Sequence, residues 1–93
     1  MLYLVAYDTE DDQKRLKLAE LLKDMGGHRI QYSAFLIDLN QDTLARLASQ
    51  AKQILAPARA RIYILPVCRR DLERIITLAH NYTQPWDEDT DLL

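Results

Sequence analysis

The chain begins with an apolar segment that ends in an acid. In an extended conformation residues 2–7 present two faces, and both are apolar: Leu2, Leu4 and Ala6 on one, Tyr3, Val5 and Tyr7 on the other. Apolar side chains on both faces are typical of a central strand that is covered on two sides. Asp8 follows directly, where this predicted strand passes into a loop.

A helical pattern follows, with local signals for its start and its end. Thr9 and Asp12 resemble a capping box in which Asp replaces the usual Glu, and Gly26–Gly27 ends the helix. Between these signals, apolar side chains recur at helical spacing: Leu18, Leu21, Leu22 and Met25. We therefore expect an amphipathic helix over residues 14–25.

The second half of the chain repeats this alternation. Residues 28–39 are rich in β-branched and aromatic side chains and form either one long bent strand or two short ones. Residues 40–42 cap a second helix that ends at Leu55, before Pro57. Residues 61–68 form another strand, in which Pro66 indicates a sheet edge or a strand end. A short helix is expected over residues 69–80.

This order of elements predicts an α+β fold, a split βαβ sandwich with one antiparallel sheet and two helices on one face. The other face then needs a cover, because Tyr3, Val5 and Tyr7 are not side chains that face water. A symmetric homodimer that stacks sheet on sheet supplies this cover. We expect residues 1–80 to form the domain and residues 81–93 a tail that docks on the partner subunit.

Composition fits one small globular domain. Of the 93 residues 48% are apolar and 28% are charged. The single cysteine, Cys68, has no disulfide partner and no neighbouring zinc ligand, so we expect a small core residue. No apolar run approaches the roughly 20 residues of a membrane span, and no signal peptide opens the chain. We therefore expect a cytoplasmic protein without membrane contact.

The charge is unevenly distributed. The net charge of −2 argues against indiscriminate binding of nucleic acid. Four of the fourteen acids lie in the last seven residues, so residues 1–84 carry ten acids against twelve Lys and Arg, a net charge of +2. A mildly basic body with an acidic tail is compatible with contacts to phosphates.

Asp8 is the residue whose position calls most for a functional explanation. A side chain at a strand end is held by the sheet and still reaches solvent, which suits a metal ligand or a general base. The alternative is that Asp8 only completes a turn, where Asp is common.

Four local patterns then occur in a fixed order. They are Tyr7-Asp8 at the strand end, Arg15 in the first helix, Gly27-His-Arg-Ile-Gln-Tyr-Ser-Ala-Phe35, and Arg61-Ile-Tyr-Ile-Leu65 in the last strand. In this order and spacing the chain resembles the small CRISPR-associated endoribonuclease family over residues 2–68.

The resemblance implies a ferredoxin-like βαββαβ fold, a homodimer, and metal-dependent hydrolysis of RNA or DNA phosphodiesters with Mg²⁺ or another divalent cation. It also implies assembly with the CRISPR-associated integrase when spacers are acquired in antiviral defence. Asp8 corresponds to the metal-binding and catalytic carboxylate of each subunit. The residues expected around the same cleft are Tyr7, Arg15, Arg29 and Phe35.

Three positions depart from the family pattern. Lys17 stands where many members have a second helix arginine; it keeps the charge for a phosphate contact but lacks the bidentate fork. Leu36 follows the phenylalanine where a glutamate is often found, and Ala34 replaces the commoner valine. These changes bear on the strength of phosphate binding more than on the fold.

The metal interpretation depends on the dimer. One carboxylate is a sparse site for Mg²⁺, which prefers octahedral oxygen coordination and usually keeps several waters. Two copies of Asp8 facing each other across a dimer axis supply two carboxylates to one ion. Such an ion polarises a phosphate and lowers the pKa of an attacking water. Arg15 and Arg29 then stabilise the charge that builds on the phosphate.

Each supporting residue also has a structural interpretation. Arg15 is either a phosphate contact or a solvated surface charge, and Arg29 either a phosphate contact or the partner of Asp24 or Asp38. Tyr7 and Phe35 are aromatics of the core or the dimer interface first.

Three functions therefore remain: a metal-dependent nuclease acting through Asp8, a non-catalytic dimer that lays DNA across the integrase complex, and a ferredoxin-like module that binds a small molecule. The absence of a Gly-rich ligand loop argues against the third.

Overall fold

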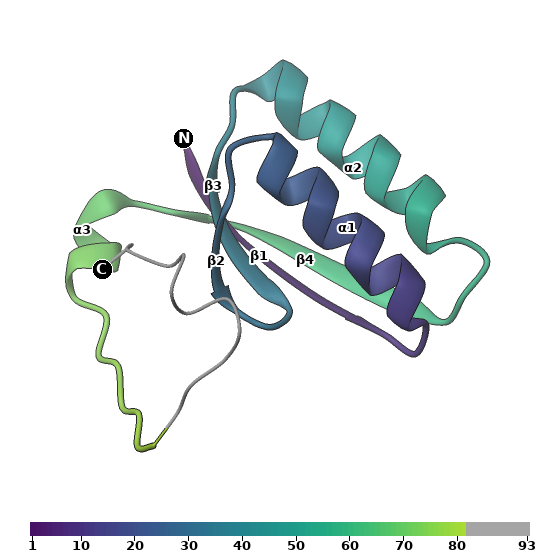
Figure 1. Ribbon diagram of the computed structural model, residues 1–93. Helices are drawn as coiled ribbons and strands as arrows, with labels where there is room; N and C mark the ends of the chain where they lie inside the picture. Colours follow the sequence, from purple (N-terminus) through teal and green to yellow (C-terminus); the bar gives the residue numbers. More distant parts are fainter. Residues whose placement is uncertain (82–93) are drawn as a thin grey trace.

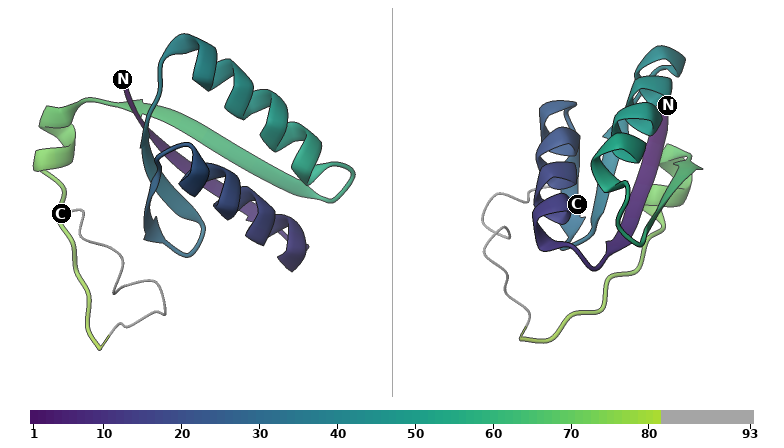
Figure 2. Two further views of the ribbon diagram at one scale, coloured as in Figure 1. Left: turned by 45° about the horizontal axis from the view of Figure 1, so that its top comes forward. Right: turned by 90° about the vertical axis from the view of Figure 1, so that its right-hand side faces the viewer.

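The computed structural model describes residues 1–81, which form one antiparallel sheet and three helices (Figure 1). In chain order the elements are β1 (Leu2–Thr9), α1 (Asp12–Asp24), β2 (His28–Gln31), β3 (Ala34–Asp38), α2 (Gln41–Leu55), β4 (Ala60–Val67) and α3 (Arg69–Glu73). The strand order is β2-β3-β1-β4, which is ferredoxin-like. Helices α1 and α2 lie side by side on one face of the sheet (Figure 2). The predicted α+β sandwich is confirmed.

The alternation of β1 decides which face of the sheet is the core. Tyr3, Val5 and Tyr7 lie under the helices, and none is more than 9% exposed. The prediction that these three side chains need a dimer partner is therefore wrong, because α1 and α2 already cover them. In β1 alone the two faces look equally apolar. The neighbouring strand shows which face is the core, because Phe35 and Ile37 of β3 are buried on the same face as Val5.

Neither α1 nor α2 covers the opposite face of the sheet. The register places Leu4 between Leu36 and Leu65, and Ala6 beside Tyr63. Tyr63 is 53% exposed and Leu65 48% exposed, which is high for large apolar side chains on a sheet. We call this surface, made by Leu4, Ala6, Tyr63 and Leu65, the open sheet face. The sheet face that α1 and α2 leave uncovered is therefore this one, and not the face of Tyr3, Val5 and Tyr7.

The helix starts follow capping rules at positions that differ in part from the predicted ones. Asn40 caps α2 as expected, with a reciprocal capping box in which Asn40 Oδ1 accepts from Thr43 N and Thr43 Oγ1 accepts from Asn40 N. For α1 the cap is Asp11, which accepts from Lys14 N. The predicted capping box with Thr9 is wrong, because Thr9 belongs to β1 and its hydroxyl accepts from Asp11 N.

Two glycines and one turn shape the path from α1 to β3. Gly26 has φ +90°, the left-handed conformation that ends a helix. A Cβ atom on Gly27 would lie 2.7 Å from the carbonyl oxygen of Leu22, so this position admits only glycine without a backbone shift. A turn at residues 32–33 then separates β2 from β3. Residues 28–39 therefore form two short strands, one of the two possibilities that the sequence left open.

The segment after β4 departs most from the sequence prediction. The helix expected over residues 69–80 ends at Glu73, since Ile75 and Ile76 find no core to pack on and Ile76 is 82% exposed. Cys68, predicted as a core residue, is exposed and caps α3, where its Sγ accepts from Asp71 N. Pro66 lies near the end of β4, an edge strand, as predicted.

The predicted docking tail, residues 81–93, lies outside the described residues except for Asn81. Among residues 1–81, no helix combines the length and the apolar content that crossing a membrane requires.

Candidate functional site

Asp8 lies at the end of β1 and points to the open sheet face. Because successive side chains of a strand point to opposite faces, Asp8 shares the face of Leu4 and Ala6 and not that of Tyr7. Its side chain is 73% exposed. The sheet therefore holds the Asp8 backbone while its carboxylate reaches solvent, as the sequence predicted.

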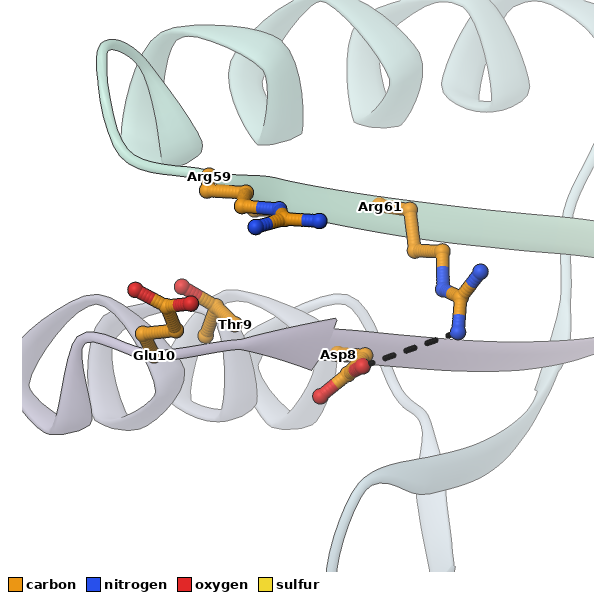
Figure 3. Close-up of a pocket in the computed structure, with 6 residues that line it drawn as sticks. Asp8, Thr9, Glu10, Arg59 and Arg61 are labelled. Atoms are coloured by element: carbon orange, nitrogen blue, oxygen red, sulfur yellow. Dashed lines mark ion pairs between the residues drawn. The ribbon is translucent and has the colours of Figure 1, made fainter.

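Arg61 is the cross-strand partner of Asp8. The two residues are paired in the antiparallel register of β1 and β4, and Arg61 Nη2 lies 3.8 Å from Asp8 Oδ2 (Figure 3). This basic neighbour was missed, although Arg61 opens one of the four sequence patterns. The signal was available: when the first and last strands of this fold pair antiparallel, the end of one lies against the start of the other.

Asp8 and Arg61 line an open pocket of about 420 Å³ between the end of β1 and the start of β4 (Figure 3). Its lining residues are Asp8, Thr9, Glu10, Arg59, Ala60 and Arg61. The pocket thus combines two carboxylates with two guanidinium groups. Such a mixed lining suits a phosphate held together with a cation, because each charge on the ligand meets its opposite.

A divalent cation fits this pocket only in part. Residues 1–81 contain no cluster of three or more His, Cys, Asp or Glu side chains placed to hold a metal. One chain offers the exposed carboxylate of Asp8, with Glu10 in the same pocket. Mg²⁺ is often bound through one or two carboxylates and several waters, so one chain has the chemistry of half a site.

Tyr7 and Phe35 belong to a second group of residues, on the helix-covered face. Both are buried, at 5% and 0% exposed, and their ring centroids lie 6.4 Å apart. The Cζ atom of Arg29 lies 5.1 Å from the Phe35 ring and 5.9 Å from the Tyr32 ring. Tyr7 and Phe35 are thus core aromatics, and Arg29 closes the core at the β2–β3 end by cation–π contact.

Burial also determines the protonation of Tyr7. Desolvation raises the pKa of the Tyr7 hydroxyl, an effect that the hydrogen bond and charge of Arg29 oppose in part. The hydroxyl donates to the carbonyl oxygen of Tyr32, 3.5 Å away. Tyr7 is therefore protonated near neutral pH and unsuited to act as a general base.

Arg15 joins the start of α1 to the end of β1. Its guanidinium donates to the carbonyl oxygen of Thr9 and to Asp12, and its Cζ lies 5.4 Å from the Tyr32 ring. The side chain is 17% exposed, so the alternative of a solvated surface charge is wrong. By holding the carbonyl of Thr9, next to Asp8, Arg15 supports the end of the strand that carries the candidate carboxylate.

The structure thus brings together four of the predicted residues and separates two others from them. Tyr7, Arg15, Arg29 and Phe35 form one cluster, called here the aromatic–arginine cluster, together with Tyr32. Asp8 lies on the opposite face of the sheet, because it directly follows Tyr7 in a strand. The expected common cleft is therefore not formed within one chain.

Lys17 belongs neither to the Asp8 pocket nor to the aromatic–arginine cluster. It is exposed on α1 and lines a groove between α1 and α2 with Gln13 and Gln50.

Comparison with known proteins identifies the family. The family model described as CRISPR associated protein Cas2 matches residues 1–75. A CRISPR-associated endoribonuclease Cas2 of Archaeoglobus fulgidus is 40% identical over 80 residues, which cover 86% of this chain and 85% of the relative. A second one, from Korarchaeum cryptofilum, is 44% identical over 71 residues, 75% of each chain.

A solved structure agrees in fold. The crystal structure of Cas2 from Streptococcus pyogenes has a TM-score of 0.76 to this chain, covering 85% of it and 100% of the other chain at 23% identity. The family resemblance indicated by the four sequence patterns is confirmed. With a match over residues 1–75 and relatives at 40% and 44% identity, the chain belongs to the Cas2 family of CRISPR-associated proteins.

Proposed function

We propose that this protein is a metal-dependent endonuclease that acts as a homodimer. The Asp8 residues of the two protomers together bind one divalent cation. The observation that carries the proposal is the exposed Asp8 carboxylate on the open sheet face of a Cas2 chain. The relatives from Archaeoglobus fulgidus and Korarchaeum cryptofilum are both named endoribonucleases. RNA is therefore the first substrate to test, and duplex DNA the second.

The open sheet face supports the dimer. Tyr63 and Leu65 leave about half of their surface exposed, and Leu4 and Ala6 continue the apolar surface across β1. Burial of apolar surface stabilises association by about 25 cal/mol per Å². A two-fold contact uses the same patch of both protomers. Asp8 lies near the end of β1, the strand that crosses this patch, so a two-fold axis at that end of β1 would set the two copies of Asp8 opposite each other.

The roles of the residues follow from their charges. The bound cation would neutralise phosphate charge and lower the pKa of its bound water. The two Asp8 carboxylates would hold the cation, and in the single chain the Asp8 side chain is 73% exposed and open to solvent. Arg15 holds the end of β1 next to Asp8 and does not contact the substrate in this role.

A non-catalytic DNA scaffold is the second candidate. The observation in its favour is the sparse metal site, since residues 1–81 contain no group of three metal ligands. In that case the exposed arginines around the pocket, Arg59 and Arg61, bind the backbone of duplex DNA without cutting it. Assembly with the CRISPR-associated integrase at the spacer-acquisition stage, in the cytoplasm, is part of both proposals.

A cleavage assay separates the two candidates. Wild type, Asp8→Ala and Asp24→Ala are compared on single-stranded RNA and duplex DNA, with Mg²⁺ or with a chelator. Asp24 is an exposed acid at the end of α1 and serves as the matched control. We expect Mg²⁺-dependent cleavage by wild type and Asp24→Ala, and none by Asp8→Ala. Cleavage that persists in Asp8→Ala overturns the catalytic assignment, and binding of duplex DNA without any cleavage supports the scaffold.

A further inference from the structure

Arg61 is held opposite Asp8 by the backbone of the sheet. β1 and β4 pair in one unbroken register from Leu2 with Val67 to Thr9 with Ala60, and Asp8 with Arg61 is one of these pairs. Directly opposed residues of antiparallel strands keep their Cβ atoms about 4.5–5.5 Å apart. Any ligand bound at Asp8 therefore lies within reach of the Arg61 guanidinium.

The ion pair itself is weak. The closest nitrogen and oxygen atoms lie 3.8 Å apart, beyond hydrogen-bond distance, and the two side chains are 68% and 73% exposed. Exposed pairs of this kind contribute little, because water screens both charges. The Arg61 side chain can therefore leave Asp8 for a stronger partner without disturbing the sheet.

A cation on Asp8 would change the partner of Arg61. It would compete with Arg61 for the carboxylate and repel the guanidinium, whereas a phosphate bound to the same cation would attract it. A guanidinium offers a phosphate two parallel hydrogen bonds. Arg59, which lines the same pocket, adds to the positive charge there.

We propose that Arg61 is the phosphate-binding residue of the Asp8 site: it pairs with Asp8 in the free protein and moves to the substrate phosphate when a divalent cation binds Asp8. The inference rests on the proposed function, since it assumes that Asp8 holds a cation. It goes beyond that function because it assigns the substrate contact to β4, and not to the aromatic–arginine cluster on the other face.

Two opposite effects are expected from Arg61→Gln. Removal of the competing guanidinium should tighten Mn²⁺ binding by about two- to fivefold. Removal of the phosphate-binding group should weaken binding of a short phosphorothioate-linked RNA by about five- to tenfold in the presence of Mn²⁺. The dependence of RNA affinity on salt should also become less steep, by about 0.7 in the logarithmic slope for each phosphate that the protein no longer neutralises.

The experiment measures Mn²⁺ affinity by calorimetry and RNA affinity by fluorescence anisotropy. Arg46→Gln is the matched control, because Arg46 is an exposed arginine of α2 on the helix layer. Arg61→Lys keeps the charge but lacks the fork, so its salt slope should match wild type while its RNA affinity falls. A thermal unfolding curve for each variant establishes that the fold is intact.

The proposal is overturned if Arg61→Gln binds Mn²⁺ no more tightly than wild type, or binds RNA like Arg46→Gln. The proposal is also overturned if Asp8→Ala binds Mn²⁺ as tightly as wild type does. Neither readout requires cleavage. Failure of the proposed function is measured separately, as cleavage that persists in Asp8→Ala.

Discussion

At the scale of single residues, the alternation of side chains along β1 sends the neighbours Tyr7 and Asp8 to opposite faces of the sheet. Tyr7 closes the core under the helices, and Asp8 reaches solvent on the other face. Substitutions at these neighbours should therefore have different consequences. Changes at Tyr7 and Phe35 should act on folding, whereas changes at Asp8 should act on the proposed cation binding with little effect on stability.

Phe35 tests this distinction. It is fully buried, so Phe35→Ala should destabilise the fold by about 3–5 kcal/mol, because a cavity replaces the ring. Phe35→Leu keeps most of the volume and should cost less than Phe35→Ala. We expect urea unfolding to show this order, and cleavage by folded Phe35→Leu to remain near that of wild type. Loss of cleavage in a fully folded Phe35→Leu protein would instead place this ring in contact with substrate.

Tyr7 should make stability depend on alkaline pH. The folded protein holds the Tyr7 proton more tightly than the unfolded chain, because burial raises the pKa of this hydroxyl above its ordinary value of about 10. This contribution is complete below about pH 10 and is lost as the pH rises through the raised pKa. The unfolding free energy of Tyr7→Phe should therefore fall less steeply above pH 10 than that of wild type. Parallel curves from chemical unfolding would show that burial of this hydroxyl does not favour its protonated form.

Residue-scale prediction from the sequence succeeded where a backbone position decides the outcome. The exposure of Asp8 follows from its place at a strand end, and Gly26 follows from the left-handed conformation that it supplies. Prediction failed where the burial of a side chain depends on which elements pack around it. Cys68 was assigned to the core from its residue type, yet it lies after the last strand, where no layer covers it.

At the scale of elements, capping residues predict a helix well only when the helix also has an apolar face that packs on the core. Helix α2 has both, a capping box at its start and an apolar face with Leu47, Ala51 and Leu55 buried. The segment after Glu73 has apolar residues at helical spacing but no layer to pack against, and it is not helical. An amphipathic pattern shows that a helix is possible, and tertiary packing decides whether it forms.

The cap of α2 can be tested directly. Asn40→Ala removes the oxygen that accepts from Thr43 N and should lower the unfolding free energy by about 1 kcal/mol. Gln41→Ala, one residue further along the exposed start of the helix, is the control and should change it little. Urea unfolding of both variants gives the comparison. Equal stability of Asn40→Ala and Gln41→Ala would mean that the capping box adds nothing to α2.

At the scale of the whole molecule, α1 and α2 cover one face of the sheet, and the proposed second copy would cover the other. The sequence predicted a homodimer that covers Tyr3, Val5 and Tyr7, whereas α1 and α2 cover that face; the choice was open because β1 is apolar on both faces. The pairing with β3 and β4 resolves this choice, and pairing is a non-local property that local pattern does not reveal. The position of Arg61 opposite Asp8 is a second consequence of the same pairing.

The proposed dimer surface should be sensitive to charge on β4. Leu65→Asp places a carboxylate on the open sheet face and should raise the dimer dissociation constant at least about 100-fold, because burying an unpaired charge is costly. Leu16→Asp is the control, since Leu16 is an exposed leucine of α1 on the helix layer. Sedimentation velocity should show a monomer for Leu65→Asp and a dimer for Leu16→Asp. A Leu65→Asp protein that remains dimeric would place the interface elsewhere.

The central claim is that two copies of Asp8 form one site, and dimers with one wild-type and one Asp8→Ala protomer test it most directly. Two different affinity tags allow such mixed dimers to be purified away from both parents. If the carboxylates share one cation, mixed dimers should cleave RNA in Mg²⁺ no faster than Asp8→Ala homodimers. Cleavage at half the wild-type rate, or faster, would contradict the account, because each protomer would then carry a complete site of its own.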